Sequence, residues 1–205
     1  MAITGMVGAV YVSDVDTAPA PFVDESCTGD AERKRYQVDD PTFRYWPLDE
    51  SITVKLNGVP VTPPGYFLER AGGYVVFDEA LDPEDEITVS GSALTLVQAG
   101  GFFNWSIDGD GDDENATTFA SQGWKEFERT LNGWSGSAEA YWGDTRFFES
   151  VSKTVVVKLY TDAGPAQDCM EGFAIINGDG IESPVEGLVQ ESVAFTGTGP
   201  LYIRF

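Results

Sequence analysis

The fold is decided within residues 117–200, which contain Trp134-Ser-Gly-Ser-Ala-Glu-Ala-Tyr-Trp142 and Glu191-Ser-Val-Ala-Phe-Thr-Gly-Thr-Gly-Pro200. In both runs large or apolar residues alternate with small or polar ones, and glycines interrupt them. This pattern is typical of β-strands joined by tight turns. No arrangement of a nucleophile beside a base interrupts the stretch. It therefore indicates a structural part and not an enzyme.

Further strands are expected on the C-terminal side, within residues 134–205. Val155 to Tyr160 is rich in β-branched residues, and Phe173 to Ile176 has the composition of a short buried strand. Gly187 to Thr196 reads as a closing strand, and residues 201–205 as a last extension. The long strands at 151–160 and 187–196 are candidates for an inner sheet that subunits share.

One amphipathic helix is predicted over residues 118–133. Trp124, Phe127 and Leu131 fall at positions i, i+3 and i+7, and Gly133 stands where a glycine often ends a helix. We expect this apolar face to anchor the helix against the side of a sheet. Replacing Trp124 with alanine should then cost several kcal/mol, as for a large-to-small change in a core.

The N-terminal half also reads as β structure. Residues 1–30 predict a strand followed by an extended arm, and residues 31–205 a single domain that includes a β-meander unit at 36–97. Within that unit, Asn57-Gly58 predicts a type I′ hairpin turn between two alternating strands. The predicted fold class is mainly β: a β-sandwich or half-open barrel with one flanking α-helix.

Composition excludes several functions. The formal charge is −22, and the acids are spread over both halves, so a conventional role in binding nucleic-acid phosphates is disfavoured. Histidine is absent, which removes the commonest general base and metal ligand. Cys27 and Cys169 are too few for a zinc site, and a bridge between them is an open question. The N-terminus lacks the features of a signal peptide, and no apolar run reaches transmembrane length.

Three groups of residues have some features of a functional site, but each has a simpler explanation. The acidic loop Asp108 to Glu114 repeats the ligand spacing of a calcium loop at Asp108, Asp110 and Asp112, but Asp113 replaces the turn glycine. A loop that leads into the helix explains these acids better. The 34 acids create many accidental carboxylate pairs, so no glycosidase pair stands out. Four tryptophans could stack on sugars, yet core or interface positions are commoner for them: Trp105, Trp124, Trp134 and Trp142.

Six runs follow one another in a fairly specific order: Trp105-Ser-Ile-Asp108, Gly123-Trp-Lys-Glu-Phe127, Gly133-Trp-Ser-Gly-Ser-Ala138, Val155-Val-Val-Lys-Leu-Tyr160, Gly172-Phe-Ala-Ile-Ile176 and Glu191-Ser-Val-Ala-Phe-Thr-Gly-Thr-Gly-Pro200. In the order of these runs the chain resembles the major tail tube proteins of long, non-contractile-tailed bacteriophages. The resemblance covers about half of the chain well.

The resemblance implies a structural protein of the virion tail, assembled in the host cytoplasm. Subunits would form hexameric rings that stack into a tube through which DNA passes without specific binding. Tape-measure, tail terminator and baseplate proteins would be its other partners, with no membrane, cofactor, metal or catalytic residue. The alternative is a β-sandwich module that binds carbohydrate or protein and is stabilised by calcium at Asp108 to Glu114.

Overall fold

The computed structural model describes residues 9–118, 121, 123–143, 146–161 and 168–204. The chain forms two compact units. Unit 1 comprises Met1–Val10, Ala99–Val155 and Leu159–Phe205, and unit 2 comprises Tyr11–Gln98 and Val156–Lys158. Among the described residues, no helix has the length and apolar character needed to cross a membrane.

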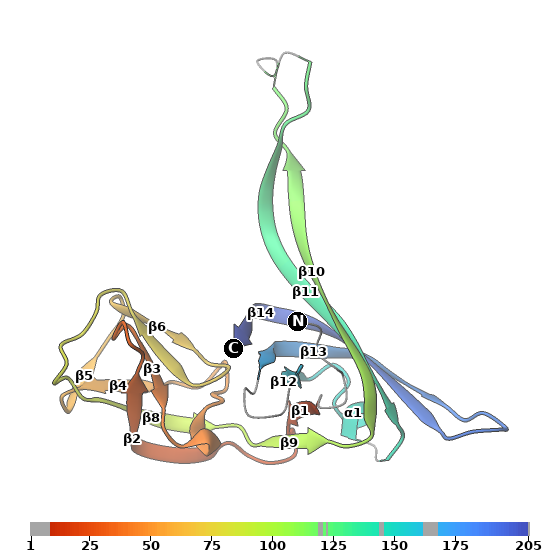
Figure 1. Ribbon diagram of the computed structural model, residues 1–205, viewed down its shortest axis with the longest axis horizontal. Helices are drawn as coiled ribbons and strands as arrows, with labels where there is room; N and C mark the ends of the chain where they lie inside the picture. The colour runs from red at the N-terminus through yellow and green to blue at the C-terminus, as the bar shows by residue number, and fades with distance from the viewer. Residues whose placement is uncertain (1–8, 119–120, 122, 144–145, 162–167, 205) are drawn as a thin grey trace. The chain divides into compact units, whose positions relative to one another are not determined.

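Two seven-stranded sheets account for most of the structure (Figure 1). Sheet A has the strand order β10-β11-β14-β13-β12-β1-β9, and the pairs β10–β11, β11–β14 and β13–β14 are antiparallel. Its strands are β1 (Ala9–Ser13), β9 (Leu96–Ala99), β10 (Phe102–Asn115), β11 (Phe127–Tyr141), β12 (Thr154–Tyr160), β13 (Cys169–Glu182) and β14 (Gln190–Arg204).

Sheet B lies in unit 2 and has the order β5-β4-β8-β2-β3-β7-β6. Its strands are β2 (Ala20–Gly29), β3 (Arg35–Val38), β4 (Thr53–Leu56), β5 (Val59–Val61), β6 (Tyr66–Glu69), β7 (Tyr74–Phe77) and β8 (Ile87–Ala93). A short 3-10 helix, η2 (Pro41–Phe43), follows β3, and the Asp40 side chain caps it by accepting a hydrogen bond from the Thr42 N–H.

Sheet B curls around a core of its own. Trp46 is fully buried there, and its Nε1–H donates to the Phe43 carbonyl oxygen at 2.7 Å. Six of the seven strands supply buried side chains to this core, among them Phe22, Val38, Val54, Tyr66, Val75 and Val89, and Val61 of the seventh strand, β5, packs against it. The mainly β fold class with a half-open barrel is confirmed.

Several local predictions are confirmed. The hairpin of β4 and β5 turns at Asn57 and Gly58, whose φ values of 52° and 77° are those a type I′ turn requires. Strands β7, β12, β13 and β14 occupy the segments in which strands were expected. In each case an alternating or β-branched run and its turn residues agree with the observed structure.

The predicted helix over 118–133 is wrong. The described residues of that segment are not α-helical, and β11 begins at Phe127. Phe127 and Leu131 are four residues apart, a spacing that places them on one side of a helix and equally on one face of a strand. Pairing with β10, from Asn115 opposite Phe127 onward, supplies the backbone hydrogen bonds. In the described part of the chain, the α-helix is α1 (Arg146–Glu149), which lies after β11.

Two further expectations are corrected. The acidic segment Asp108 to Glu114 is not a loop but part of β10, where Asp108 lies opposite Ser135. The extended arm expected after the first strand is in part β2, which pairs with β3 and β8. Both segments have a low intrinsic preference for β structure, and pairing with a neighbouring strand makes up for it.

Candidate functional site

Four neighbouring strands of unit 1, β10-β11-β14-β13, form a sheet with two unlike faces. On one face, aligned residues of β10, β11 and β14 form rows that are polar or small: Asn104–Glu139–Ser192, Ser106–Ser137–Ala194 and Asp108–Ser135–Thr196. The intervening residues point to the opposite face and are buried: Trp134, Ala138, Ala140, Val193 and Phe195. Strict alternation along the strands produces this division.

Side-chain hydrogen bonds tie the polar face together across strands. The Asn104 amide donates to Glu139 Oε2 at 3.0 Å, and the hydroxyl oxygens of Ser106 and Ser137 lie 3.1 Å apart. The three rows contain two carboxylates, Asp108 and Glu139, and no lysine or arginine. We call these nine residues the polar face. It offers hydroxyl, amide and carboxylate groups, and no cation, to whatever lies above it.

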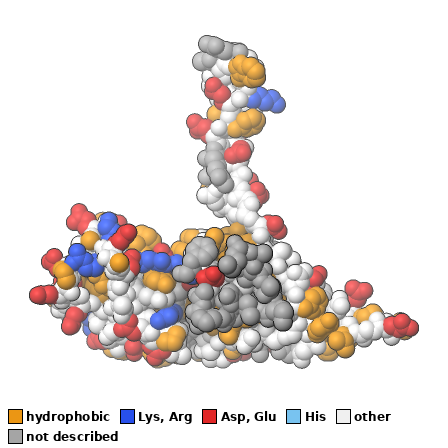
Figure 2. Space-filling view, in the orientation of Figure 1, with side chains coloured by type: hydrophobic (Ala, Val, Ile, Leu, Met, Phe, Trp, Pro, Cys, Tyr) orange, Lys and Arg blue, Asp and Glu red, His pale blue; other side chains and the backbone are white. Residues whose placement is uncertain are grey.

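Beyond the polar face, β10 and β11 continue as a two-stranded ribbon (Figure 1). β11 pairs with β14 only from Ser135 to Tyr141, whereas its pairing with β10 continues to Phe127 opposite Asn115. The apolar side chains Trp124, Phe127 and Leu131 at this end are 79%, 59% and 71% exposed, and hydrophobic groups are visible there in Figure 2. The ribbon tip, as we call these three residues, is therefore an exposed apolar surface.

The hairpin between β13 and β14 has a similar end. Its last aligned pair is Glu182 with Gln190, and Ile181, Val185 and Leu188 are exposed around it. Scattered exposed apolar residues are ordinary, but here they gather at the ends of two hairpins. Both ends are suited to contact with another protein surface.

Two acids lie beneath the polar face: Glu191 is buried, and Asp179 is half-buried with both carboxyl oxygens enclosed. Asp179 on β13 is aligned with Val193, two residues from Glu191 on β14, so both acids lie on the core-facing side. Both carboxyl oxygens of Asp179 are enclosed and have no hydrogen-bond partner among the described residues. Burial raises the pKa of Asp179 above its ordinary value and outweighs the opposing influence of the neighbouring Glu191. The ionised form of Asp179 is thus disfavoured in the fold.

Replacing Asp179 with asparagine should raise the melting temperature at pH 7. Because the folded-state pKa of Asp179 lies above its unfolded value, its contribution to stability is largest below the unfolded pKa and falls as pH rises through the folded pKa. Asparagine removes that dependence. Calorimetry from acid to neutral pH measures how the melting temperature of each variant depends on pH. Asp108→Asn is the control, because Asp108 is exposed. A lower melting temperature at pH 7 for Asp179→Asn would contradict the destabilising burial of this carboxyl group.

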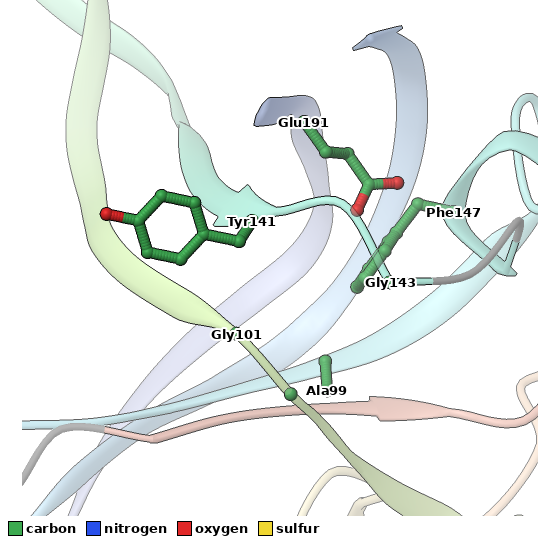
Figure 3. A pocket seen from close by; sticks show the side chains of 7 residues that line it. Ala99, Gly101, Tyr141, Gly143, Phe147 and Glu191 are labelled. Atoms are coloured by element: carbon green, nitrogen blue, oxygen red, sulfur yellow. The ribbon is translucent and has the colours of Figure 1, made fainter. Parts of the chain in front are cut away.

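Glu191 also lines a small hollow in unit 1, with a volume of about 190 Å³. Figure 3 shows its carboxylate pointing toward the Phe147 ring, while the Tyr141 side chain points away. Ala99 and three glycines complete the wall. The hollow is smaller than the roughly 300–1,000 Å³ typical of ligand pockets, and its lining shows no nucleophile beside a base.

The acidic run does not form a calcium loop. Asp108, Asp110 and Asp112 belong to the extended strand β10, in which alternate residues lie about 6.5–7 Å apart. A calcium loop coils so that its carboxylates converge at about 2.4 Å from one ion. Among the described residues, no group of three His, Cys, Asp or Glu side chains is placed to hold a metal.

The four tryptophans do not form one platform. Trp134 is buried, and its Nε1–H donates to the Gly199 carbonyl oxygen at 3.0 Å. Trp124 belongs to the ribbon tip, whereas Trp105 is half-buried on β10 and Trp142 follows β11. Cys27 and Cys169 do not form a disulfide, so the open question of a bridge between them is answered in the negative.

Sequence reasoning overlooked the polar face as a unit. The signal was present in Ser135, Ser137 and Glu139, which alternate with the buried Trp134 and Ala138. The alignment of these residues with Asn104 and Ser106 on β10, and with Ser192 and Thr196 on β14, could not be read from the sequence. Register between distant strands depends on packing that a single segment does not encode.

No protein-family model matches the chain, and no curated protein matches it. Among solved structures, the chain is similar to one in the tail of an empty GTA particle with C6 symmetry. The TM-score is 0.43 and the sequence identity 15%, and the match covers 54% of this chain and 87% of that chain. The similarity is thus to part of a tail assembly, at low identity and over about half of this chain.

Proposed function

We propose that this chain is the structural subunit of a phage tail tube. Copies associate into hexameric rings that stack into a conduit for DNA, and the chain performs no catalysis. The observation that carries the proposal is the polar face, a cation-free surface on a sheet whose other side is core. The order of motifs described above supports the same class of protein.

The polar face has the chemistry that a DNA conduit needs. Proteins hold DNA chiefly by placing Lys and Arg against its phosphates, and none stands in the three rows. Serine and threonine hydroxyls keep such a wall hydrated, while Asp108 and Glu139 repel phosphate. Because the formal net charge of each subunit is −22, a ring of six subunits carries a net charge of about −130. The proposed wall would let DNA slide because it does not bind it.

Sheet A also has the means to extend into a ring. β10 lies at the end of its strand order, so the side away from β11 is an edge. An edge strand presents backbone donors and acceptors that a strand of another copy can pair with. A head-to-tail contact of this kind generates a closed ring when the rotation between copies divides the circle.

The two apolar hairpin ends would provide further contacts between copies. A two-stranded ribbon is only marginally stable in water, so the outer part of β10–β11 gains most from being covered. A neighbouring copy would bury the ribbon tip and the exposed residues near Leu188. In this proposal the sheet forms the tube wall and the hairpins join its subunits.

Electron microscopy and cysteine labelling together test this proposal. The variant Ala194→Cys places a thiol in the middle row of the polar face. Images of concentrated protein should show tubes with sixfold symmetry. In such tubes a small maleimide should react with Cys at 194, whereas a maleimide on a large polyethylene glycol should react at least tenfold more slowly because it cannot enter the lumen.

The separated subunits are the control, since both reagents should react with them equally. Background from the natural thiols is low, because Cys169 is buried and burial raises the pKa of the Cys27 thiol to about 12. Equal labelling of tubes by both reagents would place the polar face outside the lumen. Assemblies without sixfold symmetry would contradict the hexameric ring itself.

A further inference from the structure

Unit 2 carries a hollow of about 460 Å³ on the outer side of sheet B. Thr28 on β2, Gln37 on β3 and Tyr74 on β7 are aligned across three strands and line it. A volume of this size lies within the roughly 300–1,000 Å³ of ligand pockets. The hollow belongs to the half-open barrel and shares no residue with the polar face.

Arg35 gives one wall of the hollow a fixed hydrogen-bond donor. Its Nη2 donates to Glu69 Oε2 at 2.5 Å, and its guanidinium carbon lies 3.8 Å from the centroid of the Tyr74 ring. These two contacts hold the side chain in place. Its buried Nε has no hydrogen-bond acceptor among the described residues. A buried donor of this kind is costly unless a ligand oxygen or water accepts from it.

A second arginine is held by the backbone. Arg44 donates from Nε to the Val38 carbonyl oxygen and from Nη2 to the Asp39 carbonyl oxygen, both at 2.8 Å. The hollow also contains two aspartates. Asp30 Oδ1 already accepts from the backbone N–H groups of Lys34 and Arg35, so the acceptors that face a ligand are Asp30 Oδ2 and the exposed carboxylate of Asp39. Donors and acceptors are therefore mixed around one concave surface.

The balance of charge decides which ligand fits. Two arginines face two aspartates, and Glu69 already pairs with Arg35, so the site has no positive excess for an anion. The charge of −22 on the chain further repels anions. A cation would have to approach two guanidinium groups. A hydroxyl group, in contrast, donates to a carboxylate and accepts from a guanidinium N–H.

We propose that this hollow binds a neutral polyhydroxylated ligand, a one- or two-sugar unit of a glycan. Arg35 and Arg44 donate to sugar oxygens, Asp30 and Asp39 accept from sugar hydroxyls, and Gln37 and Thr28 form the floor. The Gln37 amide is oriented by its hydrogen bond to the Gly72 carbonyl oxygen at 2.9 Å. The site does not depend on the tube proposal, because all of its residues come from one subunit.

Saturation-transfer NMR on the full chain tests the site. The probes are glucose, galactose, mannose, N-acetylglucosamine and their disaccharides, with glucuronic acid as the anionic comparison. We expect at least one neutral sugar to receive signal, and its binding to be unchanged between about 50 mM and about 500 mM NaCl because no net charge is neutralised. Thr28→Tyr, which fills the hollow, should weaken binding at least tenfold.

Thr53→Tyr is the matched control, since it makes the same change at an exposed strand position outside the hollow. It should bind like the original chain. Asp39→Ala provides a second variant with the fold unchanged, and loss of one acceptor should weaken binding about fivefold. The site is overturned if no neutral sugar receives signal, if Thr28→Tyr and Asp39→Ala bind as before, or if only glucuronic acid binds and does so in a salt-dependent way.

Discussion

Replacing Gly197 with alanine is expected to destabilise unit 1 by about 3 kcal/mol, the upper part of the range for overpacked cores. A Cβ at this position would lie inside the Trp134 indole. The ring is flanked closely on a second side, where a Cβ at Gly172 would lie 2.8 Å from its Cζ2. Its hydrogen bond to the Gly199 carbonyl oxygen would be lost if the ring moved. In a chain of this size the melting temperature should fall by about 6–12 °C.

Gly178→Ala is the matched control for this prediction. It lies on the adjacent strand β13, and a Cβ there would meet no atom within 4 Å. Because glycine is unfavourable in a strand, this change should be neutral or slightly stabilising. Calorimetry on both variants separates steric overlap from a general effect of alanine. Equal melting temperatures for the two would contradict the packing of Trp134 against Gly197.

A double variant isolates the contact itself. Trp134→Phe alone should destabilise the chain, because it loses ring volume and the hydrogen bond to Gly199. In the Gly197→Ala background the smaller ring leaves room for the added methyl group. The two substitutions should therefore cost less together than the sum of their separate effects.

Local signals predicted much of the β structure. The hairpin of β4 and β5 could be placed because Asn57 and Gly58 have a strong preference for one turn, and β12 because Val155 to Tyr160 is β-branched. The local sequence of these segments is enough to predict their structure, without knowledge of the strands that pair with them.

The ribbon could not be predicted, because its segments have weak or ambiguous preferences. Asp108 to Glu114 is rich in Asp and Gly, which are uncommon in strands, and it is extended because β11 pairs with it. The spacing of Phe127 and Leu131 fits a helix as well as a strand. The hollow of unit 2 lay beyond local reasoning for another reason: Arg35, Arg44 and Tyr74 meet only after the sheet has formed.

Substitutions at the ribbon tip are expected to weaken the association of subunits strongly. The triple variant Trp124→Ser, Phe127→Thr and Leu131→Thr should leave the melting temperature of the separated subunit nearly unchanged, because all three side chains are exposed. This reverses the expectation for a helix packed on a core. Association should suffer instead, since burying three large apolar side chains against another copy is worth about 5 kcal/mol or more.

A loss of about 5 kcal/mol lowers an association constant more than a thousandfold. If the chain assembles as proposed, tubes should be absent in the triple variant at concentrations at which the original chain assembles. Sedimentation velocity and electron microscopy measure this. Val59→Thr with Phe67→Thr is the control, because these side chains are 64% and 54% exposed on unit 2 and lie outside the ribbon. A lower melting temperature in the triple variant would mean that the tip packs within its own subunit. Normal tubes would mean that another surface joins the rings, since the ribbon would then add no contact between copies.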